Sequence, residues 1–373
     1  MIDLKLKKLG NTRIKISSIG LGTGTGFKNT DKKREHELIY ILQRARDLRI
    51  NFIDTAEVYF AGDAEKLIGK AFKKNRSKIF ISTKFSPENS SYSEVLKACE
   101  DSLKRLQTDY IDLYQIHWPN PLVPIKETLT ALEKLVKIGK VRNIGVSNFS
   151  LRQLKEIRRI SKLPIVSLQV EYNLLERSVE NEILTYCQKN KITLIAYTPL
   201  NSGNILKTEK YSELFSMLSK KYNKTPSQII LNFLISHENV VVIPATTSVK
   251  HLKENVKSTD FILEQKDTKF ISKIFSSKVK KIDTWKIKVA TNDDQKVYKT
   301  VEEALFNKQN FFPSPKMLSD DIKKGDFLKP VRVRVMQKKE GHFEYELLGG
   351  RIRYWAWVIA YNDKKPIPTI IED

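Results

Sequence analysis

Eight short apolar segments alternate with helical stretches along most of the chain, and this alternation constrains the fold more than any other feature. The strand candidates are, in order, SSIGLGTGT, FIDTA, IFIST, YIDLYQI, NIGVSN, IVSLQVEY, TLIAYTPL and VVVIPAT. A strand, a crossover helix and a second parallel strand form the unit that such alternation indicates. Eight of these units predict a (β/α)8 TIM barrel, and residues 4–16 predict a short hairpin before its first strand.

Polar side chains stand where three of these strands end. Asp54 follows the apolar pair at 52–53, Lys84 ends the next strand and His117 ends the one after it, while Tyr59 lies five positions beyond Asp54. A carboxylate that leaves a buried strand needs a partner, because an isolated buried charge is very costly. Since the carboxyl ends of barrel strands meet at one mouth, we expect these four side chains to face a common pocket.

This set of groups predicts a proton donor for a carbonyl oxygen. Lys84, held by Asp54, would stabilise a tyrosinate and so make Tyr59 a better donor. His117 would hydrogen-bond the same oxygen. Because no side chain carries a hydride, the chemistry implies a nicotinamide cofactor.

At these positions the sequence resembles the aldo-keto reductase family, over roughly residues 1–275. The shared motifs occur in family order and are GLGTG, DTAEVY, STKF, QIHWP, GVSNF, AYTPL and IPATTSVKHLKEN. The resemblance implies an NAD(P)H-dependent oxidoreductase that reduces a small-molecule carbonyl substrate. It assigns the catalytic roles to Asp54, Tyr59, Lys84 and His117.

The resemblance also implies which residues bind the cofactor, from the nicotinamide to the adenosine. Near the nicotinamide these are Gly22, Thr23, Asp54, Ser147, Asn148, Gln169 and Tyr197, with Tyr197 stacked on the ring. Along the pyrophosphate they are Thr198, Pro199, Leu200 and Ser202, and toward the adenosine Pro244, Ala245, Thr246, Thr247, His251 and Asn255. A helix that begins near Ser248 would offer free N–H groups to a phosphate.

The adenosine segment departs from the NADP-preferring pattern of the family. Where many members carry Lys and Arg, this chain has Ala245 and His251, although Lys250 and Lys253 could replace them as partners of a 2′-phosphate. We expect NADP(H) on the family resemblance, with NAD(H) as the open alternative. Trp118, next to His117, is a candidate wall of the substrate site or a packing residue, and the substrate could be an aldehyde, a ketone or a sugar-type compound.

Composition narrows the remaining classes of protein. The formal net charge of the chain is +23. Much of this charge comes from lysines scattered along predicted helices, so solvated helix faces explain it better than a surface that binds nucleic acid. Neither a long apolar segment nor an apolar signal core is present, so we predict a cytoplasmic protein without a membrane span. Cys99 and Cys187 have no CxxC or CxxH neighbours, and neither a disulfide framework nor a metal site is predicted.

The alternation stops after the barrel. We expect a linker at 276–286 and a small α+β domain at 287–373, with a helix, two strands joined by a turn, a second helix and a terminal segment PIPTIIED. This domain resembles the ParB and sulfiredoxin superfamily in its markers, which are Pro330, Val333, Gly350, Arg351, Arg353 and Ala356. Arg351 stands where sulfiredoxins carry their catalytic cysteine, so the resemblance does not extend to that chemistry.

A glycine before a helix exposes backbone N–H groups, and an arginine in the first turn adds a fork for phosphate oxygens. Gly350, Arg351 and Arg353 are therefore candidate ligands of a nucleotide, although pairing of the arginines with Glu344 or Glu346 is the alternative. Two functions remain open for the whole chain. The first is carbonyl reduction with a nucleotide-binding tail, and the second is a redox or nucleotide sensor that binds DNA or a protein partner.

Overall fold

The computed structural model describes residues 4–276, 279–289, 298–326 and 329–372. The chain divides into two compact units. The first comprises Met1–Phe149 and Gln153–Phe275, and the second comprises Ser276–Asp373 together with Ser150–Arg152. Each unit has a hydrophobic core of its own.

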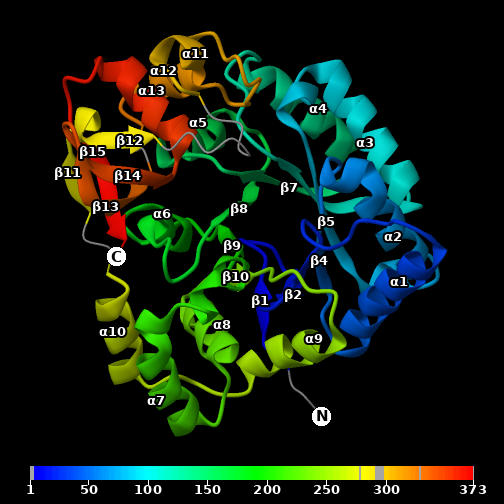
Figure 1. Cartoon of the computed structure of the whole chain (residues 1–373). Helices are drawn as coiled ribbons and strands as arrows, with labels where there is room; N and C mark the ends of the chain where they lie inside the picture. The colour runs from blue at the N-terminus through cyan, green and yellow to red at the C-terminus, as the bar shows by residue number, and fades with distance from the viewer. Residues whose placement is uncertain (1–3, 277–278, 290–297, 327–328, 373) are drawn as a thin grey trace. The chain divides into compact units, whose positions relative to one another are not determined.

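Among the described residues, eight parallel strands of the first unit form one sheet in chain order (Figure 1). They are β3 (Leu21–Gly22), β4 (Phe52–Asp54), β5 (Phe80–Phe85), β6 (Ile111–Ile116), β7 (Val141–Ser147), β8 (Ile165–Glu171), β9 (Thr193–Tyr197) and β10 (Val240–Val242). Bridges from Ile19 to Val242 and from Gly22 to Ala245 join the last strand to the first. The sheet therefore closes, and the predicted (β/α)8 barrel is confirmed.

Helices lie outside the strands of this barrel (Figure 1). They are α1 (Lys32–Asp47), α2 (Asp63–Phe72), α3 (Tyr92–Leu106), α4 (Ile125–Lys137), α5 (Leu151–Ile160), α6 (Ile183–Lys189), α7 (Ser212–Tyr222), α8 (Pro226–Ser236), α9 (Val249–Val256) and α10 (Gln265–Ile274). Local sequence sets their starts. The Ser91 side chain accepts from the N–H of Glu94 at the start of α3, and Thr225 forms a capping box with Gln228 at the start of α8.

A hairpin precedes the barrel, as the sequence predicts. Its strands β1 (Leu6–Lys8) and β2 (Lys15–Ser17) pair antiparallel. Leu9 and Ile16 pack with residues at the starts of the barrel strands, Phe52 and Phe80 among them. The hairpin thus helps to fill the interior at the amino ends of the strands, which leaves the carboxyl ends for a site.

The C-terminal unit contains, in its described part, a five-stranded sheet in the order β11-β15-β13-β14-β12. The strands are β11 (Lys280–Ile282), β12 (Ile287–Val289), β13 (Val331–Glu340), β14 (Phe343–Gly349) and β15 (Ile367–Glu372), and the helices are α11 (Val301–Leu305), α12 (Pro315–Lys323) and α13 (Arg351–Tyr361). Val331, Val333 and Leu347 of the sheet share a core with Tyr354 and Trp355 of α13. The unit is therefore an α+β fold built on one apolar face of its sheet.

The segment that we expected to be a linker, 276–286, differs from that expectation in its second half. Residues 280–282 form β11, which pairs antiparallel with β15. Thr284 is buried, and its hydroxyl donates a hydrogen bond to Asp363 at 2.6 Å. These residues belong to the C-terminal unit, because the edge of the sheet supplies partners for their backbone groups.

Candidate active site

The four polar residues at the strand ends are brought together by the parallel register of the barrel. Asp54 is the last residue of β4, Lys84 lies near the end of β5, and His117 directly follows β6. Tyr59 begins a short 3-10 turn, Tyr59–Gly62, after β4. Since adjacent parallel strands place equivalent ends side by side, residues separated by up to 63 positions in the chain meet at one edge.

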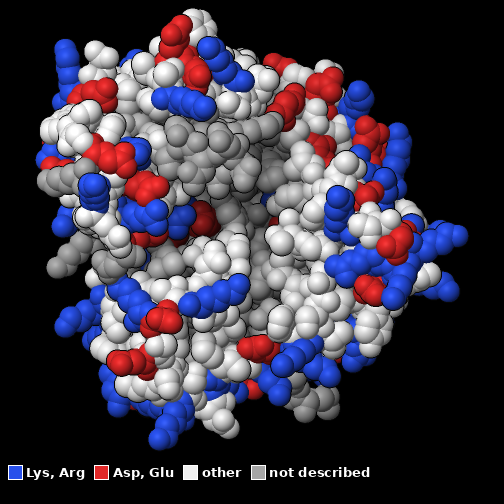
Figure 2. Space-filling view, in the orientation of Figure 1, with Lys and Arg blue, Asp and Glu red and all other residues white. Residues whose placement is uncertain are grey.

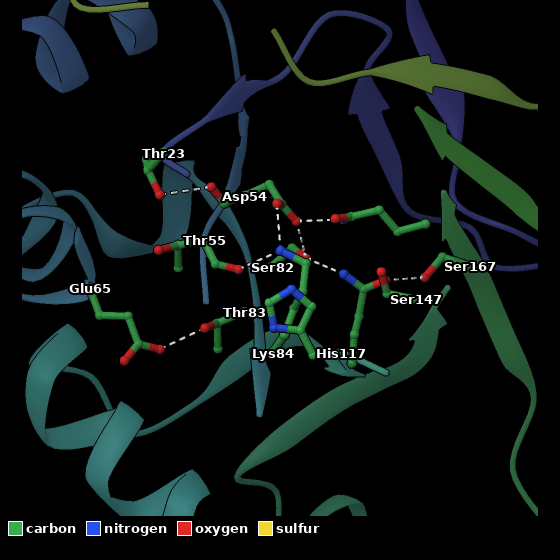
Figure 3. Close-up of polar contacts among 12 residues, drawn as sticks. Thr23, Asp54, Thr55, Glu65, Ser82, Thr83, Lys84, His117, Ser147 and Ser167 are labelled. Atoms are coloured by element: carbon green, nitrogen blue, oxygen red, sulfur yellow. Dashed lines mark hydrogen bonds and ion pairs between the residues drawn. The ribbon is translucent and has the colours of Figure 1, made fainter. Parts of the chain in front are cut away.

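Asp54 and Lys84 form a buried ion pair (Figure 3). The Lys84 Nζ atom donates to Asp54 Oδ1 at 2.7 Å and to the carbonyl oxygen of Thr55 at 2.7 Å. The other carboxylate oxygen, Oδ2, accepts from Ser82 Oγ at 2.9 Å and from Gln169 Nε2 at 2.8 Å. Burial by itself would lower the pKa of Lys84, but the negative charge and the hydrogen bond of Asp54, with a smaller contribution from Tyr59, outweigh it and raise that pKa.

Tyr59 and His117 lie above this pair. Their rings meet edge to face with centroids 5.9 Å apart, and the Lys84 Nζ atom lies 5.1 Å from the centroid of the Tyr59 ring. Burial, together with the positive charge of Lys84, lowers the pKa of His117 to about 3. The imidazole is therefore neutral at physiological pH. One of its ring nitrogens carries a hydrogen and can donate a hydrogen bond to an oxygen.

A cavity of about 640 Å³ opens over these groups. Most of the residues that the sequence nominated line it, and they are Gly22, Asp54, Tyr59, His117, Trp118, Ser147, Asn148, Gln169, Tyr197, Thr198, Pro199, Leu200, Ser202, Pro244, Ala245, Thr246, His251 and Asn255. Three nominated residues are not part of the lining. Lys84 lies buried beneath the cavity, Thr23 is buried and its hydroxyl donates to the Asp54 carbonyl at 3.0 Å, and Thr247 packs near Gly26.

One wall of the cavity is a chain of polar contacts. The Tyr197 hydroxyl donates to Asn148 Oδ1 at 3.0 Å, and Asn148 Nδ2 donates to the carbonyl oxygen of His117 at 3.1 Å and to Ser147 Oγ at 3.0 Å. Asn148 has a φ of 61°, a left-handed conformation that asparagine tolerates better than most residues. Amide and hydroxyl groups beside a flat ring fit a nicotinamide with its carboxamide, because they offer both donors and acceptors.

Several lining residues were not nominated from the sequence. They are Gly24, Thr25, Gly203, Leu206, Ser227, Ile243 and Glu254. A Cβ atom at Gly24 would lie only 3.2 Å from Tyr59 Cζ, so the glycine permits close approach of the phenol. Glu254 precedes the nominated Asn255 on α9, and helical spacing from His251 was the signal that could have found it.

In the C-terminal unit, the candidate nucleotide ligands stand at the start of α13. Gly350 precedes the helix with a φ of 89° and without a side-chain cap. Arg353 Nη1 donates to the carbonyl oxygens of Lys329 and Pro330 at 3.0 and 3.1 Å. Its guanidinium group also lies 3.0 Å from where a Gly350 Cβ atom would be. Arg353 therefore connects the start of α13 to the residues directly before β13.

Known proteins match the barrel part of the chain. The Aldo/keto reductase family model covers residues 18–275. Methylglyoxal reductase YeaE of Escherichia coli (strain K12) is 31% identical over 262 residues, 70% of this chain and 92% of that protein. The thermostable aldo-keto reductase Tm1743 has a TM-score of 0.69 and 41% identity, with coverage of 73% and 100%, respectively. An aldo/keto reductase of Klebsiella pneumoniae crystallised with NADP and acetate has a TM-score of 0.68 and 29% identity, with coverage of 73% and 96%.

The closed barrel and its matches define the class as NAD(P)H-dependent oxidoreductases. More particularly, the chain belongs to the aldo/keto reductase family. The family match ends at residue 275, so the C-terminal unit lies outside it. The resemblance of that unit to ParB and sulfiredoxin stays a prediction. Within the described residues, no helix combines the length and the apolar character that crossing a membrane requires.

Proposed function

We propose that the barrel reduces an aldehyde or ketone by hydride transfer, with Tyr59 as the proton donor. The observation that carries this proposal is the buried Asp54–Lys84 pair beneath a half-buried phenol at the floor of a large cavity. The carbonyl-reducing relatives support it, because methylglyoxal reductase of Escherichia coli matches along most of its length. A small aldehyde or dicarbonyl is the substrate class to test first.

The reaction adds a hydride to the carbonyl carbon and a proton to its oxygen, and the bound nicotinamide supplies the hydride. Tyr59 gives its proton to the substrate oxygen and becomes a tyrosinate. The Lys84 ammonium group, whose Nζ atom lies 5.1 Å from the centroid of the Tyr59 ring, would stabilise the negative charge on the phenolate oxygen. Asp54 keeps Lys84 charged and in place, because its carboxylate accepts one of the ammonium hydrogen bonds.

His117 acts as a neutral hydrogen-bond donor in this scheme. With its pKa lowered to about 3, the imidazole does not compete with Tyr59 as an acid at physiological pH. It can orient the substrate oxygen toward the phenol. Such preorganised donors stabilise charge that develops on the oxygen in the transition state.

The cofactor is NADP(H) in this proposal, as the NADP-bound Klebsiella relative supports. Ser147, Asn148 and Gln169 would hold the carboxamide and Tyr197 would pack against the ring. The residues from Thr198 to Ser202 would hold the pyrophosphate. The nominated residues from Pro244 to Asn255 would hold the adenosine part. Of these nominated residues, Thr247 does not line the cavity.

Turnover of NADPH with methylglyoxal tests the proposal directly. Tyr59→Phe should lower kcat by about 10³-fold while the Kd of NADPH stays unchanged, because only the proton donor is removed. Tyr40→Phe is a matched control, since Tyr40 is 54% exposed on α1. Unchanged turnover in Tyr59→Phe would remove Tyr59 from the mechanism. Absence of turnover with a panel of aldehydes, ketones and sugars, together with tight DNA binding, would favour the sensor function instead.

For the C-terminal unit we propose that the start of α13 binds a nucleotide phosphate. The supporting features are the uncapped helix start at Gly350 and the cationic Arg351 in the first turn. Arg353 is bonded to backbone carbonyls and is better suited to hold the helix than to bind a ligand.

Calorimetry on the full chain tests this site. The barrel is first saturated with NADPH, and ATP is then titrated into the protein and into Arg351→Ala. Loss of ATP binding in Arg351→Ala, but not in Lys364→Ala, is the expected result. Equal binding by all three proteins would place any ATP site elsewhere.

A further inference from the structure

The turn that carries Tyr59 has an unusual backbone. After Tyr59, Phe60 and Ala61 have φ values of 52° and 53°, and Gly62 has a φ of 85°. Three successive residues are therefore in the left-handed region, which costs free energy for any residue with a Cβ atom. A backbone of this kind persists only where the surrounding structure holds it. The contacts that hold this turn consequently bear on where the phenol lies.

The charged groups of α2, the helix that begins directly after this turn, fall into two kinds. Lys66 and Lys70 are exposed, on an outer face where lysines gather over α1 and α2 (Figure 2). Glu65 is instead completely buried in the first turn of the helix. A buried carboxylate needs partners, because its charge is otherwise too costly to keep. The position of Glu65 therefore depends on specific contacts.

Glu65 is bonded on two sides. Its Oε1 atom accepts from the Thr83 hydroxyl at 2.6 Å (Figure 3), and Thr83 directly precedes Lys84 on β5. Its Oε2 atom accepts from the Nε atom of Arg105, in the last turn of α3, at 2.6 Å. Burial raises the pKa of Glu65, and the positive charge of Arg105 acts against this rise. One carboxylate thus joins the strand that carries Lys84 to the helix that follows Tyr59.

Arg105 also reaches the left-handed turn itself. A Cβ atom at Gly62 would lie only 2.6 Å from Arg105 Cδ, so the arginine side chain lies directly against the last residue of the turn. The Arg105 Nη2 atom donates to Ser102 Oγ at 3.0 Å, which orients the guanidinium group from its own helix. At Gly69 a Cβ atom would lie 2.7 Å from the Arg105 carbonyl oxygen, so α2 and α3 are in close contact there. Arg105 is therefore held in place by both helices.

We propose that Glu65 and Arg105 are positioning residues for Tyr59. They hold the left-handed turn at its end. Through Thr83 they also fix this turn relative to Lys84, whose Nζ atom lies 5.1 Å from the centroid of the phenol ring. The inference rests on the proposed function, since it assumes that Tyr59 gives the proton. Neither Glu65 nor Arg105 is part of the cavity lining, so they act on the reaction through the position of the phenol.

Arg105→Met tests the proposal, because methionine keeps an apolar side chain beside Gly62 but removes the guanidinium group. The kcat for methylglyoxal per NADPH-binding site should fall about tenfold or more, since a small displacement of a reacting group slows the chemical step. The KM for methylglyoxal and the Kd of NADPH should stay unchanged, because the cavity lining is intact. Fluorescence titration with NADPH counts the binding sites and so removes any unfolded fraction from the comparison.

Arg76→Met is the matched control. Arg76 and Asp112 form a second largely buried pair, with Nη2 and Oδ2 2.6 Å apart. Asp112 lies near the start of β6, at the opposite end of the barrel strands from Tyr59. This variant should lose stability but keep the kcat per NADPH-binding site of the parent protein. Equal kcat values in Arg76→Met and Arg105→Met would overturn the proposal, because the effect would then be that of any buried pair.

A second variant covers the case in which Arg105→Met fails to fold. When Glu65→Gln is combined with Arg105→Met, no carboxylate is left without its cation, so the double variant should be more stable than Arg105→Met alone. Its kcat per NADPH-binding site should still be about tenfold or more below that of the parent. A kcat equal to that of the parent would overturn the proposal.

Removal of the proton donor separates a positioning role from a merely structural one. If the pair acts through the phenol, Arg105→Met should not lower the residual turnover of Tyr59→Phe any further, whereas independent effects would multiply. Multiplied losses would overturn the inference and leave the proposed function standing. Turnover by Tyr59→Phe at the rate of the parent would instead remove the proposed function, and the inference would fall with it.

Discussion

The Asp54 site of the barrel and a charged pair on the sheet of the C-terminal unit are bonded in different ways. In the barrel, the carboxylate of Asp54 accepts from Lys84 and Ser82 on β5 and from Gln169 on β8. On the sheet of the C-terminal unit, Arg334 and Glu346 form a single pair near the surface, at a distance of 2.7 Å. A change in the first arrangement leaves several buried groups without partners, whereas a change in the second affects one pair.

The largest expected effect is that of Lys84→Met, which tests whether the buried groups around Asp54 depend on one another. Removing one member of a buried ion pair leaves the charge of Asp54 uncompensated and should cost about 3–5 kcal/mol of unfolding free energy. Turnover should fall about 10²–10³-fold, because the tyrosinate loses its cation. Urea unfolding and methylglyoxal-dependent NADPH oxidation measure the two effects.

A second variant keeps this test informative if Lys84→Met fails to fold. Adding Asp54→Asn removes the uncompensated charge, so the double variant should be more stable than Lys84→Met alone. If the losses of unfolding free energy in the two substitutions were additive, Asp54 and Lys84 would not act as a pair. The contrast between the barrel site and the single pair of the C-terminal unit would then be wrong.

Lys7→Met tests whether one side chain of the N-terminal hairpin stabilises the segment between α8 and β10 through several hydrogen bonds. The Lys7 Nζ atom donates to the carbonyl oxygens of Ile235, His237 and Val240 at 2.5, 2.8 and 2.7 Å. Its loss should cost about 2 kcal/mol, because three carbonyl oxygens lose the donor that they share. Lys8→Met is the control on the same strand, since Lys8 is exposed. Equal melting temperatures of the two variants would contradict this role.

Arg353→Ala should have a smaller effect that is confined to the C-terminal unit. The loss of two hydrogen bonds to Lys329 and Pro330 should cost about 1–2 kcal/mol, against less than about 0.5 kcal/mol for the exposed pair in Arg334→Ala. Three of the four tryptophans, Trp285, Trp355 and Trp357, lie in this unit, so their fluorescence follows its unfolding. Reduction of methylglyoxal should not change; a parallel loss of turnover would show that the two units depend on each other.

A further prediction concerns the dependence of stability and turnover on pH. The pKa of His117 is lowered to about 3, so the folded protein does not protonate this residue where the unfolded chain does, between its ordinary value near 6.5 and about 3. Stability from the neutral imidazole is therefore present above about pH 6.5 and is lost progressively as the pH falls. His117 should add no acid limb to kcat/KM between about pH 6 and 8. A limb near pH 6.5 that disappears in His117→Gln would contradict this.

The strand-end residues could be predicted because parallel strands bring equivalent positions together. Once eight βα units were recognised, Asp54, Lys84 and His117 had to stand at one mouth. The arrangement of Asn148 and Tyr197 could not be predicted, because their hydrogen bond depends on a left-handed backbone at Asn148. Thr23 was nominated for the cofactor, but its hydroxyl bonds to the Asp54 backbone instead of facing the cavity.

The C-terminal unit was predicted less completely, and the reason is the length of its elements. The strands β11 and β12 have three residues each and pair with β15 and β14, far along the chain. A three-residue strand has too few positions to show an alternating pattern. The longer hairpin of β13 and β14 and the helix α13 were expected, because their periodicity is visible locally.

The sequence by itself determined the order of strands and helices, and with it the residues that stand at the carboxyl ends of the barrel. Only the tertiary structure decided which way those side chains point. Lys84 lies beneath the cavity and not in it, and Lys250 and Lys253 line a different hollow from Ala245 and His251. For the two lysines of α9, the physical reason is that the packing of a helix against its neighbours sets its rotation about its own axis. A shift of one residue along a helix turns a side chain by about 100° and so from one space into the next.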